Sequence, residues 1–254
     1  MSVLTATFNA PSLDRKVPVT VIYPEERQEP CPVLYLLHGL HGSEWDWVTR
    51  TRVGKLAETA GLCVVMPAGE NMFYADSAVT GNYYGRFICE DLPRFIESTF
   101  RVIPERDKRY IAGLSMGGYG ALVNGLRRPD VFSRIGAFSS GLIKEHILNS
   151  TDEPGSGIRT RTQFAAMFGL KDVSDFPGSE HDYDALARQR ANDSHRPAIY
   201  LTCGTEDSLY APNLAFHELL NGLGYRHVWE SRPGDHNWDF WDTAVEKFIA
   251  MLGE

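Results

Sequence analysis

Short runs of apolar and β-branched residues alternate along the chain with longer stretches whose apolar residues recur at helical spacing. The runs that predict strands are residues 3–8, 17–23, 32–38, 62–66, 110–112, 135–138, 198–202 and, more weakly, 228–230. The first two runs alternate apolar and polar residues, which indicates a half-buried antiparallel pair. The run at 32–38 is continuously apolar, as expected of a strand that is covered on both faces.

Five of the intervening stretches carry the helical pattern: about 48–60, 86–99, 116–127, 212–221 and 238–252. In one of them, Phe87, Leu92, Phe95 and Ile96 recur at roughly helical spacing. This order of strands and helices predicts an α/β fold with a mostly parallel central sheet flanked by helices.

Residues 141–196 break the alternation, because they are polar and contain one amphipathic piece around 163–170. The segment holds too few apolar residues for a core of its own. We therefore expect a single domain over residues 1–254, in which 141–196 is an insertion that covers one end of the sheet as a partial lid.

Charge excludes one class of partner. The 254 residues carry 25 Lys and Arg against 33 Asp and Glu, a net charge of −8, whereas neutralising nucleic-acid phosphates requires concentrated positive charge. We expect no nucleic-acid partner. We also expect no membrane partner, since no stretch approaches the roughly 18 apolar residues of a membrane span.

The cysteines and the first residues bear on the cellular compartment. Cys31, Cys63, Cys89 and Cys203 form no CxxC motif, so we expect free thiols rather than a disulfide framework. Residues 1–16 lack a basic stretch that leads into an apolar one. Both observations predict a cytoplasmic protein.

The most informative segment is a G-x-S-x-G pattern at residues 113–117, centred on Ser115. It directly follows a predicted strand and directly precedes a predicted helix, which is the context that gives the pattern its meaning. A serine on such a tight turn presents its hydroxyl above the carboxyl edge of the sheet. Ser115 is therefore the candidate nucleophile.

A second loop, His38-Gly39-Leu40-His41-Gly42, follows the apolar strand run at 32–38. Acyl transfer needs two N–H donors aimed at the oxygen that becomes negative. We expect these donors to be the backbone N–H groups of Leu40 and of Met116, the residue after the serine. The alternative, that His38 and His41 bind a metal, has weak support, because a His-x-x-His pair on a turn is by itself weak evidence for zinc.

The remaining candidates follow in the order serine, acid, histidine that this architecture requires. Asp207 is the expected acid, with its neighbour Glu206 as the alternative, and both come just after the strand at 198–202. His236 is the expected base, in a turn just before the last helix. Its neighbour Asp235 is interpreted as a turn former.

With these residues in hand, the chain resembles the α/β-hydrolase esterases of the esterase D group. These include tributyrin esterases and the feruloyl and acetyl esterases of carbohydrate esterase family 1. The segments that carry the likeness are 32–39, 111–121 and 234–238. The resemblance implies an α/β-hydrolase fold, no cofactor and no metal, and ester substrates with short acyl or aryl-acyl groups, including acylated carbohydrates.

S-formylglutathione hydrolases are close relatives of this group. The sequence departs from their usual motif around the nucleophile and from the run that follows their base, with His236-Asn-Trp-Asp-Phe-Trp241 in its place. The sequence therefore predicts a serine carboxylesterase, with an S-formylglutathione hydrolase-like thioesterase as the alternative. A non-catalytic binding protein of the same fold is a third reading. It is disfavoured because Ser115, Asp207 and His236 are all present.

Loop aromatics are the candidates for the substrate pocket. We expect Trp45, Tyr84, Phe164 and Phe168 to wall an acyl pocket, with packing between loops as the alternative role. Tryptophan and tyrosine in exposed loops would also suit contact with a second copy of the chain.

Overall fold

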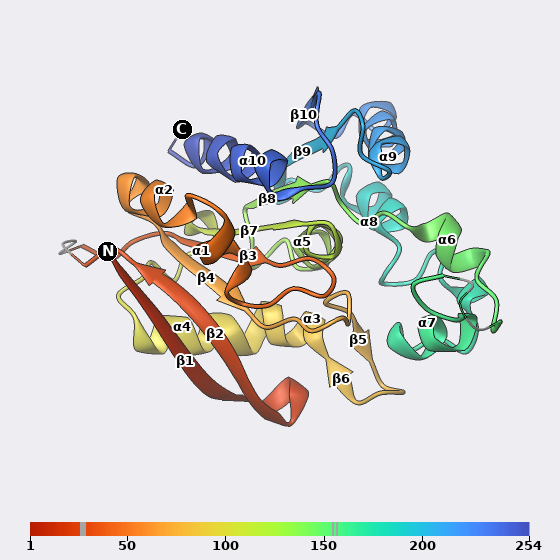
Figure 1. The fold of residues 1–254 in the computed structure, drawn as a ribbon, viewed down its shortest axis with the longest axis horizontal. Coiled ribbons are helices and arrows are strands. Elements are labelled where there is room, and N and C mark those ends of the chain that lie inside the picture. Colours follow the sequence, from red (N-terminus) through yellow and green to blue (C-terminus); the bar gives the residue numbers. More distant parts are fainter. Residues whose placement is uncertain (26–28, 154, 156, 254) are drawn as a thin grey trace.

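A twisted eight-stranded sheet runs through the computed structural model, which describes residues 1–25, 29–153, 155 and 157–253 (Figure 1). The strand order is β1-β2-β4-β3-β7-β8-β9-β10. The strands are β1 (Ser2–Ala10), β2 (Arg15–Tyr23), β3 (Val33–Leu37), β4 (Cys63–Pro67), β7 (Arg109–Leu114), β8 (Arg134–Phe138), β9 (Ala198–Gly204) and β10 (His227–Arg232). Each of the eight strand runs predicted from the sequence corresponds to one of these.

Strand direction explains where a site can form. The pairs from β4 through β10 are parallel, whereas β1 pairs with β2 and β2 with β4 in the antiparallel sense. The register joins Leu37 to Gly113, Leu114 to Phe138, and Phe138 to Thr202. The loops after β3, β7, β8 and β9 therefore emerge at one edge of the sheet, where α/β proteins bind ligands.

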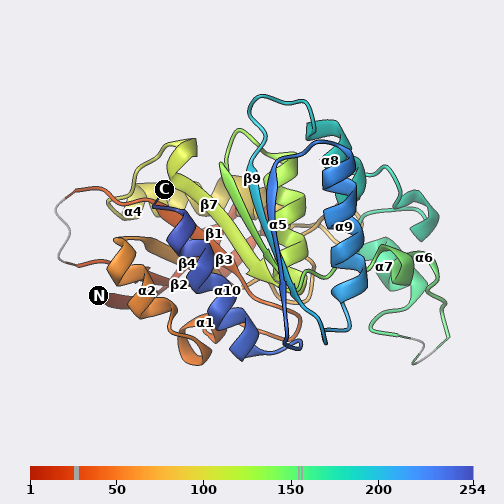
Figure 2. The same ribbon diagram turned by 90° about the horizontal axis from the view of Figure 1, so that it is seen from above.

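Helices cover both faces of the sheet (Figure 2). One face packs on α1 (Asp46–Arg50), α2 (Val53–Ala60) and α10 (Trp238–Met251). The other packs on α3 (Tyr84–Arg86), a π-helical stretch (Phe87–Asp91), α4 (Leu92–Thr99), α5 (Met116–Arg127) and α9 (Tyr210–Gly222). Neighbouring strand residues alternate between the two cores, so Leu34 and Leu36 face one and Tyr35 and Leu37 the other.

One predicted helix is interrupted. The stretch expected at 48–60 forms α1 and α2, because Thr51 adopts an extended conformation with φ −140° and ψ 171°. The Thr51 hydroxyl accepts a hydrogen bond from the N–H of Val53, and the N–H of Arg52 donates to Asp242 on α10 at 2.7 Å. These contacts favour a break that the apolar spacing does not reveal.

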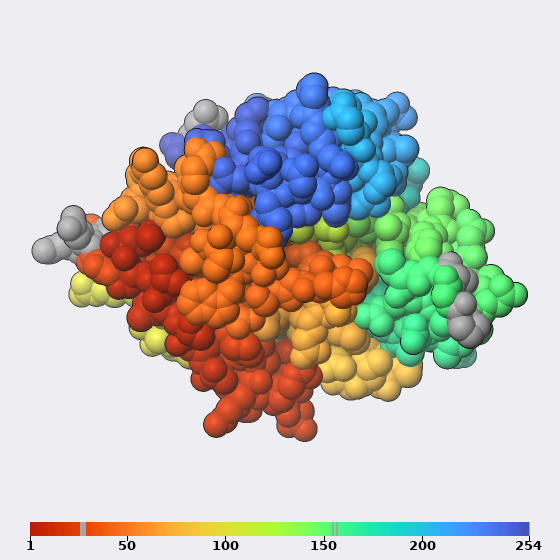
Figure 3. Space-filling model, viewed as in Figure 1, coloured from red at the N-terminus to blue at the C-terminus, as the bar shows by residue number. Residues whose placement is uncertain are grey.

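The segment 141–196 contains α6 (Lys144–Leu148), α7 (Arg161–Met167) and α8 (Tyr183–Arg190). Only the helix near 163–170 was expected. A two-stranded ribbon, β5 (Asp76–Ser77) with β6 (Asn82–Tyr83), was also not predicted. Figure 3 shows α6 and α7 as a lobe at one end of the molecule.

Short 3-10 turns complete the described structure: Pro11–Leu13, Arg106–Lys108 and Val173–Asp175. Within the described residues, no helix combines the length and apolar character needed to cross a lipid bilayer.

Candidate active site

Ser115 occupies the sharp turn between β7 and α5, with φ 53° and ψ −118°. A side chain rarely adopts a positive φ, so the surroundings must hold it there. The Ser115 N–H donates to the carbonyl of Phe138 at 2.9 Å, and the Ser115 carbonyl accepts from Tyr119 at 3.0 Å.

Close backbone packing at this turn requires glycine. A Cβ on Gly117 would lie 2.4 Å from the carbonyl oxygen of Leu37, and one on Gly113 would lie 2.5 Å from the backbone of Gly117. The G-x-S-x-G pattern therefore reflects steric need at both glycines.

His236 reaches the serine from the loop between β10 and α10. The Ser115 hydroxyl donates to His236 Nε2 at 3.0 Å. The Asn237 side chain caps α10 by accepting from the N–H of Phe240 at 3.1 Å, which fixes the loop directly after the histidine. The Trp241 indole meets the imidazole edge to face, with ring centroids 4.8 Å apart.

Asp207 lies on the other side of the imidazole. His236 Nδ1–H donates to Asp207 Oδ2 at 2.9 Å, and the N–H of Leu209 donates to Asp207 Oδ1 at 2.8 Å. Burial of the carboxyl raises its pKa, but the hydrogen bonds from His236, Leu209 and Ser139 outweigh burial and hold the pKa below its ordinary value. The carboxylate form therefore faces the histidine.

The two neighbouring acids lie elsewhere. Glu206 is exposed, and its carboxylate accepts from the N–H of Gly234 and from the Thr205 hydroxyl. Asp235 accepts from the N–H of His236 at 2.7 Å, which is a local turn contact. The structure thus brings Ser115, His236 and Asp207 together and leaves the alternative acid outside.

The loop after β3 lies against the serine. A Cβ on Gly39 would come within 3.4 Å of the Ser115 Cβ, and Leu40 lines the same cleft as Ser115. Met116 is the first residue of α5, where backbone N–H groups lack partners within the helix. Neither the Leu40 nor the Met116 N–H is hydrogen-bonded to another part of the chain that the structure describes.

His38 is bonded to the backbone on both sides of its ring. Nε2 accepts from the N–H of Gly69 at 2.9 Å, so Nδ1 carries the proton and donates to the carbonyl of Gly39 at 2.7 Å. Burial lowers the pKa of His38 and keeps the ring neutral. Among the described residues, no group of three or more His, Cys, Asp or Glu side chains is placed to hold a metal ion.

A cleft of about 450 Å³ opens above the serine. Residues from three segments line it: Gly39, Leu40, His41, Gly42, Asp46, Arg50, Leu114, Ser115, His236, Trp238 and Trp241. No described residue of 141–196 is among them, so the expected lid lies beside this cleft.

The four aromatics expected to wall the pocket do not line this cleft. Tyr84, Phe164 and Phe168 are buried in the main core, and Phe168 packs on Phe73 and Tyr119. Trp45 is 39% exposed on the outer side of its loop. Tyr84, Phe164 and Phe168 therefore serve packing in the core, whereas Trp45 lies at the surface.

Sequence reasoning missed Arg50, Trp238 and Trp241 as cleft residues. The two tryptophans were detectable, because they are the first and fourth residues of the helix that follows His236, and residues three apart share a face. Arg50 was not, because it lies beside the serine through a contact with Trp238, which is distant in the sequence.

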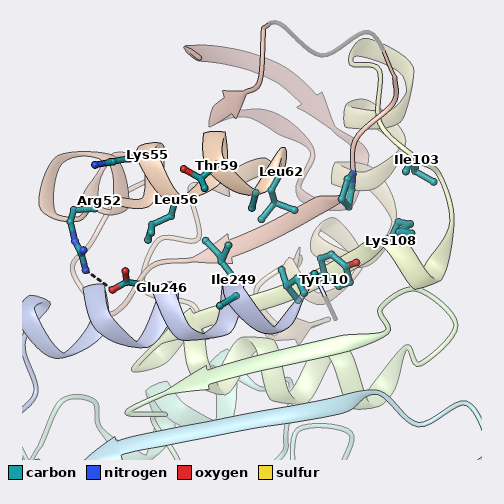
Figure 4. A pocket seen from close by; sticks show the side chains of 15 residues that line it. Arg52, Lys55, Leu56, Thr59, Leu62, Ile103, Lys108, Tyr110, Glu246 and Ile249 are labelled. Carbon is teal, nitrogen blue, oxygen red and sulfur yellow. Dashed lines mark hydrogen bonds and ion pairs between the residues drawn. The ribbon is translucent and has the colours of Figure 1, made fainter.

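A larger cavity of about 720 Å³ lies between α2 and α10, lined by Leu56, Leu62 and Ile249 among others (Figure 4). Its lining includes residues at the amino ends of β3, β4 and β7, which is the opposite edge of the sheet from Ser115. It contains none of the candidate site residues.

Comparisons with known proteins identify the family to which the chain belongs. Residues 10–254 match the model of the Esterase family, described as "Putative esterase". An acetyl esterase of Caldicellulosiruptor saccharolyticus is 32% identical over 265 residues, which cover 100% of this chain and 99% of the relative.

Several solved structures of serine hydrolases and esterases superpose on this chain. A fluorophosphonate-binding serine hydrolase of Staphylococcus aureus, FphF, superposes with a TM-score of 0.87 at 27% identity, covering 100% of this chain and 98% of that one. The S-formylglutathione hydrolase FrmB of the same organism gives 0.85 at 27% identity, covering 100% and 99%. A ferulic acid esterase gives 0.81 at 27% identity, covering 99% and 97%.

The fold is thus that of the α/β-hydrolases, with a mostly parallel sheet and helices on both faces. The chain belongs to the Esterase family, within the esterase D and carbohydrate esterase family 1 group, and it is an esterase.

Proposed function

We propose that the protein is a serine carboxylesterase that hydrolyses short-chain acyl or aryl-acyl esters through an acyl-enzyme on Ser115. The observation that carries the proposal is the pair of hydrogen bonds that join Ser115 Oγ to His236 at 3.0 Å and His236 to Asp207 at 2.9 Å. A serine hydroxyl is a weak nucleophile unless a base removes its proton during attack. His236 is that base.

The steps follow from the positions of the atoms. Ser115 Oγ attacks the ester carbonyl carbon while its proton passes to His236 Nε2. The imidazolium that forms is stabilised by the buried Asp207 carboxylate, which also fixes the proton on Nδ1. The tetrahedral intermediate then expels the alcohol, which takes the proton from Nε2. Water hydrolyses the acyl-enzyme by the same path in reverse.

The N–H groups of Leu40 and Met116 are the proposed oxyanion donors. They flank the serine from the β3 loop and from the first turn of α5. A donor of this kind contributes about 3 kcal/mol to transition-state stabilisation. The His38 bonds to Gly39 and Gly69 hold the first donor's loop in place before substrate arrives.

The size of the cleft and the relatives support small acyl groups. A cleft of about 450 Å³ lies at the small end of the usual range for ligand sites. The acetyl esterase relative covers the whole chain, and the ferulic acid esterase structure superposes over 99% of it. We therefore infer acetyl and aryl-acyl esters, including acylated carbohydrates, as the substrate class.

The test is a panel of p-nitrophenyl esters from acetate to laurate, with acetylated xylose and methyl ferulate. We expect kcat/KM to be greatest for the short or aryl-acyl substrates, whereas a flat profile out to laurate would contradict the short-chain specificity. In Ser115→Ala we expect activity to fall roughly 10⁴-fold or more with the melting temperature little changed.

Ser98→Ala is the matched control, because that hydroxyl lies on α4 and donates only to the carbonyl of Phe95. It should retain full activity. Wild-type activity in Ser115→Ala would overturn the mechanism.

A thioesterase acting on S-formylglutathione is the second candidate, supported by the full-length superposition on the hydrolase FrmB. The same serine chemistry would serve it, with a thiol as the leaving group. Comparing kcat/KM for S-formylglutathione and acetylated xylose separates the two. A preference for the thioester of more than about a hundredfold would identify a thioesterase, since that equals almost 3 kcal/mol of transition-state discrimination.

A further inference from the structure

One cationic side chain lines the cleft beside the serine and has no part in the mechanism above. Arg50 is the last residue of α1, and it is exposed. Its guanidinium lies over the indole of Trp238, with Cζ 5.7 Å from the ring centroid. No carboxylate or hydrogen-bond acceptor among the described residues pairs with it, so its donors are free for a group in the cleft.

Asp46 is a carboxylate in the same cleft, but it forms no ion pair with Arg50. Asp46 lies one helical turn earlier on α1, at a spacing that often allows an ion pair. Its two oxygens instead accept from the N–H and the hydroxyl of Ser43, each at 3.2 Å. The charge of Asp46 is thus engaged in its own turn, while Arg50 is held by an aromatic ring.

Contacts between rings connect Arg50 to the catalytic histidine proposed above. The imidazole of His236 meets Trp241 at 4.8 Å, Trp241 meets Trp238 at 5.2 Å, and Trp238 carries the guanidinium. In the tetrahedral intermediate, the group nearest His236 Nε2 is the leaving group, because it must receive the proton held there. The two tryptophans therefore link Arg50 to the base that protonates the leaving group.

We propose that Arg50 is a specificity residue that binds a carboxylate carried by the leaving group of the ester. The planar guanidinium offers paired N–H donors that match the two oxygens of a carboxylate. Stacking on Trp238 restricts the side chain before substrate arrives, which reduces the entropy lost on binding. This inference rests on the proposed esterase mechanism and predicts that, among its ester substrates, those with an anionic leaving group are preferred.

The test compares two acetate esters that share one acyl group. One is 3-acetoxyphenylacetate, whose leaving phenol carries a carboxylate, and the other is its neutral N-methylamide. We expect the wild-type protein to prefer the anionic ester in kcat/KM by about fivefold, the size of an ion pair at a partly exposed site. Arg50→Gln should lower this ratio to about one, and Arg50→Lys should retain part of it.

Arg226→Gln is the matched control. Arg226 is also exposed, and it precedes β10 at the opposite edge of the sheet, so its loss removes the same charge from outside the cleft. It should keep the wild-type ratio. If Arg226→Gln lowers the ratio as much as Arg50→Gln does, the preference comes from net charge and the proposal fails.

Salt provides a readout that needs no variant. At about 1 M NaCl the screening length falls to about 3 Å, and the wild-type preference for the anionic ester should shrink. Equal wild-type rates on the two esters at low salt would overturn the role of Arg50 and leave the esterase mechanism intact. Failure to hydrolyse either ester would instead count against the proposed function itself.

Discussion

The imidazole of His38 accepts a hydrogen bond from the N–H of Gly69 at 2.9 Å and donates one to the carbonyl of Gly39 at 2.7 Å. The ring thereby ties the proposed oxyanion loop to the segment after β4. The Tyr74 hydroxyl adds a bond to the His38 carbonyl at 3.1 Å. Preorganisation of the Leu40 N–H thus depends on a buried, neutral histidine.

Substitutions of His38 can test its hydrogen bonds to Gly39 and Gly69 separately. In His38→Asn, the shorter amide can still donate to Gly39 but leaves the buried N–H of Gly69 without its acceptor. An unsatisfied buried group costs about 1–3 kcal/mol. We expect kcat to fall about tenfold with little change in KM, because the loop acts on the transition state. His38→Gln places an oxygen nearer the Nε2 position, so its kcat should fall less than that of His38→Asn. Equal kcat in the wild-type protein and both variants would refute the proposed role of His38 in holding the loop.

The acid of the proposed triad can be tested against its neighbour. Asp207→Asn keeps the shape of the side chain but removes the charge that faces His236, and the amide can favour the wrong imidazole tautomer. We expect kcat to fall roughly 10⁴-fold. Glu206→Gln changes a carboxylate that bonds to Gly234 and Thr205 outside the cleft, so it should stay near wild-type activity. The reverse result would assign the acid to Glu206.

Two glycine substitutions distinguish steric need from helix propensity. In Gly117→Ala the new Cβ would lie 2.4 Å from the Leu37 carbonyl oxygen and 2.7 Å from that of His38. Backbone atoms cannot easily yield, so the free energy of unfolding should fall by about 1–3 kcal/mol. In Gly222→Ala, at the end of α9, the new Cβ meets no atom within 4 Å. This substitution should raise the free energy of unfolding by up to about 1 kcal/mol. Urea titrations of both variants measure the contrast.

His181 predicts a dependence of stability on pH. Burial, with a smaller contribution from the positive charge of Arg127, lowers its pKa to about 4. The unfolded chain then binds the proton at higher pH than the folded one does, so the stabilising contribution is complete above the ordinary value of about 6.5. This contribution of His181 is lost as the pH falls from about 6.5 towards 4, and the free energy of unfolding decreases in total by on the order of 3 kcal/mol.

The measurement is the free energy of unfolding at pH 7.5 and pH 5. His181→Leu should lose less stability between these two values than the wild-type protein does. His195→Gln, at an exposed histidine of the same insertion, should behave as wild type. Identical pH dependence in wild type and His181→Leu would contradict the assignment.

The sequence predicted the eight strands and the approach of Ser115, His236 and Asp207, because each depends on local pattern. Strand runs are set by alternation or continuity of apolar residues, and the nucleophile turn by glycines at positions where a Cβ would meet backbone atoms. The order serine, acid, histidine then placed the other two residues on loops at the same sheet edge.

The pocket could not be predicted in the same way. Phe164 and Phe168 are aromatic residues in a polar segment, and nothing local shows that they turn into the main core rather than towards the serine. Arg50 lines the cleft with its guanidinium over Trp238, a residue distant in the sequence. Such positions are fixed by contacts between distant segments, which apolar spacing does not record.

The last helix, α10, begins two residues after His236. Ion pairs and a hydrogen bond to other segments hold this helix in place. Arg52 holds Asp242 and Glu246 with ion pairs of 2.7 Å each, and Arg134 donates to the carbonyl of Met251 at 2.5 Å. These contacts anchor α10 along its length. Substitutions that remove these anchors would loosen the helix and displace His236 while most of the sheet stays folded, so an activity assay would detect the loss before circular dichroism does.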